Sequence, residues 1–218
     1  MKSLILLMVA GLAADAGSIT LLSGVSAGES NNFGPNVLIT PETPWAIDPF
    51  AKWVSFENTG RGGIMLPNTD LSTPTAIFYQ DFTLTGGTGV TGSIQIWADD
   101  TATVKLDGVL LFPANPTLEE HCAGGPIGCT PANSTNIIFS APGLVHRLEF
   151  DVYQRGSDTF GLMYSGQVDS TVIPEPATLS IACIGLAAFG LLRLTRSRRT
   201  PSSLRYAPGL EKRTTGGP

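Results

Sequence analysis

One short stretch of the sequence gathers the side chains best suited to bind a ligand. Trp97, Asp99 and Asp100 follow one another closely, and residues 93–98 alternate between polar and apolar side chains as a β-strand does. Trp97 and Asp99 are therefore expected on the face opposite to the apolar one. A tryptophan beside carboxylates can stack on a sugar ring and hydrogen-bond its hydroxyl groups, and adjacent carboxylates can share a Ca²⁺ ion. The pattern predicts a carbohydrate or calcium site at these three residues.

Ordinary structural roles compete for the same side chains. Aspartates in turns commonly cap backbone amides, and this is the commoner role for Asp99 and Asp100. Trp97 would be a core residue if both faces of its sheet were covered, and the core role is the favoured one for Trp45 and Trp53. We expect no metal site elsewhere and no resident cofactor. Ca²⁺ at these aspartates is the one bound ion that stays as an alternative.

Two cysteines frame a glycine-rich loop. Six residues, Ala-Gly-Gly-Pro-Ile-Gly, separate Cys122 from Cys129, and in an oxidising compartment this spacing favours a disulfide. A loop this short stabilises the fold by roughly 2–3 kcal/mol in the chain-entropy view. The alternative is a metal site with His121, which supplies three ligands at most. A redox site would need Cys-x-x-Cys, which the sequence lacks.

The sequence carries no motif of a known catalytic machinery. A nucleophile elbow, a Walker loop and His-Glu-x-x-His are all missing, and the chain has only two histidines. We therefore predict a protein that is not an enzyme. Two distant carboxylates would suffice for glycosidic chemistry, so a small glycan-processing enzyme stays open as the last alternative.

The N-terminal residues have the order of a secretory signal peptide. Lys2 precedes a short apolar run, residues 4–12, and the small residues of Ala14-Asp15-Ala16 follow. A positive start, an apolar core and a small-x-small site are what signal peptidase recognises. We predict a signal peptide over residues 1–16 that is cleaved after Ala16, with the first strand of the domain beginning near Ile19.

The C-terminal region predicts a membrane anchor. Residues 177–192 carry no charge and have no polar stripe, and as a helix they would extend about 24 Å. Leu194 lengthens the apolar run, so the predicted transmembrane helix covers residues 177–194. A basic cluster directly after an apolar span places that end in the cytoplasm, and here the cluster consists of Arg193, Arg196, Arg198 and Arg199.

The residues around this anchor resemble a known sorting signal. Pro174-Glu175-Pro176, the apolar helix and the arginines follow one another as in the PEP-CTERM signal of Gram-negative bacteria. The resemblance implies processing by an exosortase, in addition to signal peptidase, in a bacterium that makes exopolysaccharide. It also implies a cell-envelope or cell-surface protein, single-pass before processing and then released to the extracellular matrix. Residues 195–218 form a basic tail, predicted to be disordered.

Between the two signals lies one domain, residues 17–169, joined to the anchor by a linker over residues 170–176. Residues 17–172 contain five Lys and Arg against 15 Asp and Glu, so a nucleic-acid partner is not expected. Apolar alternation with period two recurs between turns rich in Gly, Pro, Asn and Asp, and Asp107-Gly108 is typical of a tight hairpin turn. The sequence predicts an all-β fold, an antiparallel β-sandwich of the jelly-roll type, with about eight strands.

Two stretches of this domain resemble galactose-binding-like jelly rolls. Residues 97–108 are similar to a strand and hairpin of that fold, and residues 141–153 are similar to its return strand, with His146 in the place of the usual Asn. The fold hosts many functions. We therefore expect a surface or matrix protein that interacts with extracellular polysaccharide, with a specific carbohydrate- or calcium-binding module as the alternative.

Overall fold

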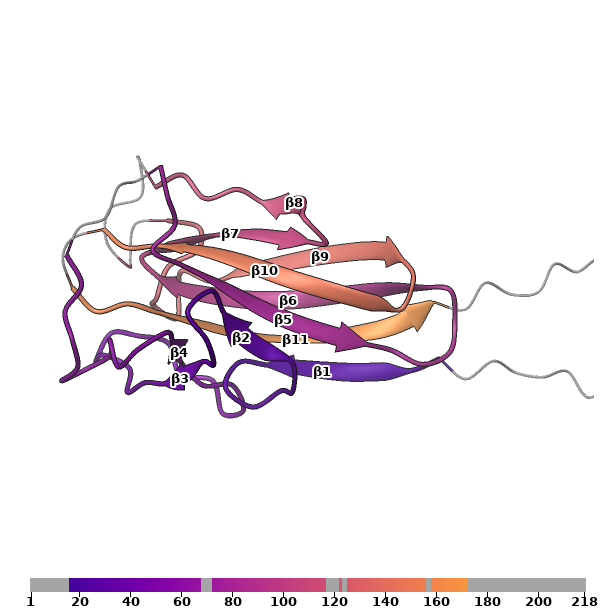
Figure 1. Ribbon diagram of the computed structural model, residues 1–218, viewed down its shortest axis with the longest axis horizontal. Coiled ribbons are helices and arrows are strands. Elements are labelled where there is room, and N and C mark those ends of the chain that lie inside the picture. Colours follow the sequence, from indigo (N-terminus) through magenta and orange to yellow (C-terminus); the bar gives the residue numbers. More distant parts are fainter. Residues whose placement is uncertain (1–15, 68–71, 117–121, 123–124, 156–157, 172–218) are drawn as a thin grey trace, which may run out of the picture. The chain divides into compact units, whose positions relative to one another are not determined.

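The computed structural model describes residues 16–67, 72–116, 122, 125–155 and 158–171 (Figure 1). The chain divides into two units, residues 1–173 and 174–218, and all described residues belong to the first. Nearly all of the predicted signal peptide, the Pro-Glu-Pro motif, the residues 177–194 and the arginine cluster lie outside these ranges. The described part of the chain holds no helix with the length and apolar character that a membrane crossing requires.

The described residues form two antiparallel sheets, as the alternation predicts. One sheet has six strands, and the other has five. The six-stranded sheet runs in the order β3 (Val37–Leu38), β4 (Val54–Ser55), β11 (Gly161–Thr171), β6 (Gly89–Asp99), β9 (Thr135–Pro142), and β1 (Ser18–Leu22) also pairs with β11. The five-stranded sheet runs in the order β2 (Glu29–Asn31), β5 (Ala76–Thr83), β10 (Val145–Tyr153), β7 (Thr101–Leu106), β8 (Val109–Phe112).

The turn residues close the hairpins where the sequence places them. Asp107 and Gly108 join β7 to β8 with φ of 51° and 80°, the left-handed conformation that a tight hairpin turn needs at its two central positions. The buried His146 holds this turn to its neighbour: its Nδ1 lies 2.7 Å from Asp107 Oδ2, and its Nε2 lies 3.0 Å from the carbonyl oxygen of Gly143. His146, which stands in the place of the usual Asn of the return strand, therefore joins two turns at one end of the five-stranded sheet.

The main core lies between the two sheets. It is built from the inward-facing residues of the long strands, among them Phe78, Phe82, Ile94, Ile96, Leu148, Phe150, Leu162 and Tyr164. Gln80 sits on this buried face between two phenylalanines, and its side-chain oxygen accepts a hydrogen bond of 2.9 Å from the Tyr164 hydroxyl. The buried amide is therefore satisfied across the sheets, as a polar group in a core must be.

A second, smaller core covers part of the outer face of the six-stranded sheet. Residues 39–53, which contain no strand, fold back over that face and bring two tryptophans against β6 and β11. The Trp45 and Trp53 rings lie 4.2 Å apart between centroids. The members of this cluster are Ile39, Trp45, Ala46, Ala51, Trp53, Trp97, Cys129 and Met163.

The chain enters and leaves the sandwich at the same end. Ser18 in β1 pairs with Asp169 in β11, and the backbone N–H of Ser170 donates to the Gly17 carbonyl oxygen at 2.7 Å. Asp99 lies at the other end, because it pairs with Gly161, the first residue of β11. The exit of the chain and the predicted ligand residues are thus separated by the length of β11 (Figure 1).

Candidate functional site

The two aspartates of the predicted site lie at the end of β6, and both are buried. Asp99 is 4% exposed and Asp100 is 3% exposed. Asp99 Oδ2 accepts a hydrogen bond of 3.1 Å from the Thr159 hydroxyl, and Asp100 Oδ2 accepts one from the backbone N–H of Arg155. The capping role that competed with ligand binding therefore exists at Asp100.

The aspartates line a cavity of about 360 Å³ at this end of the sandwich. Acidic residues line it from three segments of the chain: Glu42 from the segment after β3, Asp99 and Asp100 from the end of β6, and Asp158 from the segment before β11. One cation, Arg155, lies among them. The remaining lining residues are Pro44, Trp45, Cys122 and Thr159.

Burial sets the charge state of this cavity. It raises the pKa of Asp99 to about 9, and the neighbouring Asp100 carboxylate adds to the rise through its negative charge and a hydrogen bond between the two groups. Asp99 therefore keeps its proton at neutral pH. A protonated carboxyl beside a second carboxyl offers both a donor and an acceptor, and a bound cation would favour loss of that proton.

The ring of Trp97 does not face solvent. It is 7% exposed and belongs to the second core, where Met163 and the two other tryptophans cover it. The expectation of an exposed ring that stacks on a sugar was wrong, because the strand-free residues 39–53 cover the outer face of the sheet at this point. The competing interpretation, that both faces are covered and Trp97 is core, is confirmed, as are the core roles of Trp45 and Trp53.

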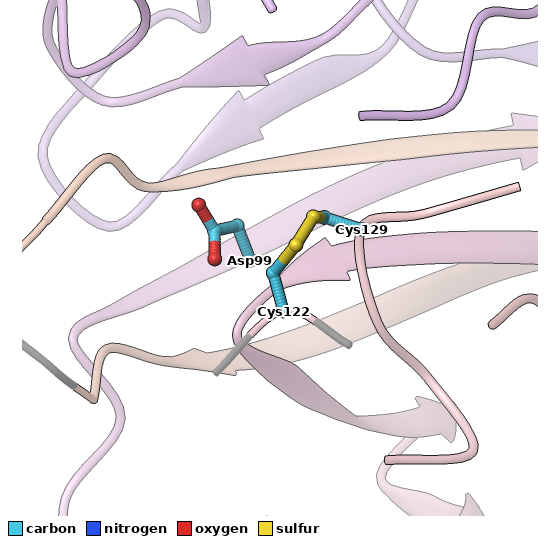
Figure 2. Close-up of side chains that lie close together, drawn as sticks. All are labelled: Asp99, Cys122 and Cys129. Carbon is cyan, nitrogen blue, oxygen red and sulfur yellow. A yellow bond between two sulfur atoms is a disulfide. The ribbon is translucent and has the colours of Figure 1, made fainter. Parts of the chain in front are cut away.

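Cys122 and Cys129 form the predicted disulfide. Figure 2 shows the bridge beside the Asp99 side chain, and the two sulfurs and a carboxylate oxygen all lie within 4.8 Å of one another. Two sulfurs bonded to each other are not thiolates, so this group is not a metal-ligand set in the oxidised protein. The bridge instead forms part of the cavity wall through Cys122. His121, the third ligand of the alternative metal site, lies outside the described residues.

The residues that complete the cavity had no signal in the sequence. Glu42 lies between two prolines and Asp158 lies in a polar loop, and neither belongs to a motif. They reach Asp99 only because residues 39–53 and the segment before β11 meet at the same end of the sandwich. A local pattern therefore identified the aspartate pair and missed its neighbours.

The chain has little similarity to known proteins. No family model matches it, and the comparison with curated proteins found no match. Among solved structures, it is similar to the native structure of a family 35 carbohydrate binding module from Clostridium thermocellum, with a TM-score of 0.38 and 9% sequence identity over 71% of this chain and 98% of that chain. A likeness this distant carries no inference, so the site is interpreted from its own geometry.

Proposed function

We propose that the chain is an exported, non-enzymatic surface or matrix protein of a Gram-negative bacterium. Its signal peptide would direct export, and an exosortase-type enzyme would process it at Pro174-Glu175-Pro176. Its β-sandwich, of the jelly-roll type, would interact with extracellular polysaccharide. The observation that carries this proposal is the order of signals after the domain: the motif, an uncharged run and the arginine cluster follow one another directly.

The topology of the sandwich supports display from one end. The last strand, β11, ends at Thr171, three residues before the Pro-Glu-Pro motif. The chain therefore leaves the domain at the end opposite to the carboxyl-lined cavity. A domain tethered through Thr171 presents the cavity at its free end, where an extracellular ligand has access.

Replacing Pro174, Glu175 and Pro176 with alanine is expected to block processing. In an exosortase-containing host, the wild-type chain should lose its C-terminal region, and its domain should appear at the cell surface or in the medium. The triple variant should accumulate in the membrane with its C-terminus intact. Cell fractionation with an antibody to the domain, and mass spectrometry of the C-terminus, distinguish the two forms. Glu211→Ala, a change beyond the motif, should behave as the wild type does.

One result would contradict the proposal as a whole. It is a full-length wild-type chain in the soluble cytosolic fraction with both termini uncut, because neither export nor sorting would then have occurred.

The cavity favours a second candidate function, a calcium-binding module. Acidic residues from three separate segments line it, and calcium prefers several oxygen ligands. The carbohydrate form of this alternative is weakened, since its stacking residue, Trp97, is buried. Glu42, Asp99, Asp100 and Asp158 are the residues that would hold the ion.

Calcium is expected to stabilise the full chain if the cavity binds it. At 100 times its dissociation constant, CaCl₂ at pH 8 should raise the free energy of unfolding by about 2.7 kcal/mol. Unfolding can be followed by tryptophan fluorescence, with MgCl₂ for comparison. The double variant Asp99→Asn and Asp100→Asn should lose the effect, whereas Asp169→Asn at the other end of the sandwich should keep it. The absence of any shift at millimolar CaCl₂ would exclude this candidate.

A further inference from the structure

The free edge of β9 is an unprotected strand edge. Within the described ranges, β9 is paired on one side alone, with β6, and the register runs one for one from Thr135 to Pro142 without a bulge. Its eight residues, Thr-Asn-Ile-Ile-Phe-Ser-Ala-Pro, include no charge. Ile138 in the middle of the strand is 80% exposed. An exposed, flat and uncharged edge is a template for pairing with another strand.

The other strands at the sheet edges differ from β9 in ways that hinder pairing. On the far side of the sandwich, β1, β2 and β3 have only five, three and two residues. On the near side, β8 has four residues, and its pairing with β7 is interrupted by a register shift. Short strands and bulges are the devices by which proteins protect their edges. In the described part of the chain, β9 is the one edge strand that has neither a short length nor a bulge, and its single proline, Pro142, is its last residue.

The apolar character of this side extends beyond one residue. β8 lies beside β9 at the edge of the other sheet. Its residues Val109 and Leu110 are 66% and 55% exposed, and the strand, Val-Leu-Leu-Phe, carries no charge either. One side of the sandwich therefore presents two adjacent uncharged edges with exposed aliphatic side chains.

We infer that the edge of β9 binds β9 of a second copy of this chain, and so joins two six-stranded sheets into one. Among the sides that a second copy could approach, charge favours this one. Residues 17–172 have five basic against 15 acidic residues, so two copies repel one another over most of their surfaces. The repulsion is least where both copies present an uncharged edge, whereas a basic partner would be attracted to the acidic surfaces instead.

Antiparallel pairing makes the interface symmetric. A two-fold axis perpendicular to the sheet, midway between the two strands at the level of Ile138, places each Ile138 opposite its counterpart. It also keeps Ile137 and Phe139, which face the core, on the inner face of the joined sheet. Seven residues of each strand, 135–141, then pair with one another, and they extend about 24 Å. A contact of one strand is smaller than the roughly 1,200 Å² of a stable interface, so we expect a micromolar dissociation constant. On a cell surface the local concentration of the chain is high, so an affinity of this size is enough for dimers to form.

Charges at position 138 test this pairing. In the full chain purified in mild detergent, sedimentation equilibrium should show a concentration-dependent dimer. Ile138→Lys and Ile138→Asp should each weaken dimerisation by on the order of tenfold or more, because like charges then lie directly opposite each other. An equimolar mixture of the two variants should dimerise again, since opposite charges face each other. Because Ile138 is exposed, both variants should keep the wild-type tryptophan fluorescence.

A cross-linking experiment in the host tests the same register. In a Cys183→Ala background, Ile138→Cys should form a disulfide-linked dimer at the cell surface. Ser93→Cys, the cross-strand neighbour of Ile138 on β6, lies one strand away from the edge and should not. A monomeric wild-type chain, dimerisation that Ile138→Lys leaves unchanged, or cross-linking of Ile138→Cys to a different protein instead of a second copy would each overturn the inference.

Discussion

Replacing Trp97 with alanine is expected to lower the free energy of unfolding of the domain by about 3–5 kcal/mol. The indole is 7% exposed and packs in the second core between β6 and the residues 39–53. Its removal leaves a cavity that the strand-free segment above it fills only in part. Part of that segment lines the carboxyl-lined cavity through Glu42 and Trp45. If the cavity binds calcium, as the second candidate function proposes, the variant should therefore also bind it less well, although Trp97 itself lines no part of the cavity.

Trp97→Phe separates packing from hydrogen bonding. The Trp97 Nε1 has no hydrogen-bond partner among the described residues, so phenylalanine gives up apolar volume and no hydrogen bond. We expect this variant to cost about 1–2 kcal/mol, well below the alanine variant. Denaturant unfolding followed by the fluorescence of Trp45 and Trp53 measures both. A cost below about 1 kcal/mol for the alanine variant would contradict the packing described here.

The stability of the domain is expected to fall as the pH rises from about 4 toward 9. An aspartate in the unfolded chain loses its proton near its ordinary pKa of 3.8, whereas burial and the Asp100 carboxylate raise the pKa of Asp99 in the folded domain to about 9. Below 3.8 both states hold the proton, and the contribution of Asp99 is fully present. Between the two pKa values only the folded state holds it, so unfolding releases a proton and becomes more favourable as the pH rises.

Asp99→Asn should remove most of this dependence and stabilise the domain above neutral pH. Burial also raises the pKa of Glu29 and of Asp151, so a smaller slope in the same direction should remain. The asparagine oxygen can accept from Thr159 and its amide can donate to Asp100, which reproduces the hydrogen bonds of the protonated acid without a proton to lose. One released proton corresponds to a slope of about 1.4 kcal/mol per pH unit. Denaturant unfolding of the full chain at several pH values measures the slope, because all three tryptophans lie in the domain.

Asp169→Asn provides the matched control. This aspartate lies at the opposite end of β11, where it is partly exposed, and hydrogen bonds from Ser18 and Gln167 lower its pKa. The same chemical change at position 169 should leave unchanged the slope of the free energy of unfolding between pH 4 and 9. If the slope persists in Asp99→Asn and disappears in Asp169→Asn, the assignment of the buried proton to Asp99 is wrong.

Local patterns were sufficient to predict most of the longer strands of this fold. The described residues form eleven strands where about eight were predicted, because strands of two or three residues, such as β2, β3 and β4, are too short to show an alternation. The alternation at Ile94, Ile96 and Ala98 identified the buried face of β6, and the residues Asp107-Gly108 identified the hairpin between β7 and β8. Each of these signals lies within about ten residues of the element that it predicts. The disulfide was predictable for the same reason, because its two cysteines are close in the sequence.

The second core was not predictable in this way. Alternation showed that Trp97 faces away from the main core, but not that residues 39–53 cover it. That segment has no strand and no apolar period, and its position depends on the contact of its tryptophans with Met163, more than a hundred residues away. The cavity depends on the same long-range contacts, so only its aspartate pair was identified from the sequence.

The position of β11 has a mechanical consequence. β11 lies between β1 and β6, and the chain continues from its last residue, Thr171. Under the proposed function, a force on the tether that is opposed by a load near Asp99 acts along the length of this strand. The hydrogen bonds that join β11 to β6 on one side and to β1 and β4 on the other then carry the load together in shear, instead of opening one after another as in a peeled hairpin. A surface protein built in this way resists flow and traction best along the direction of β11.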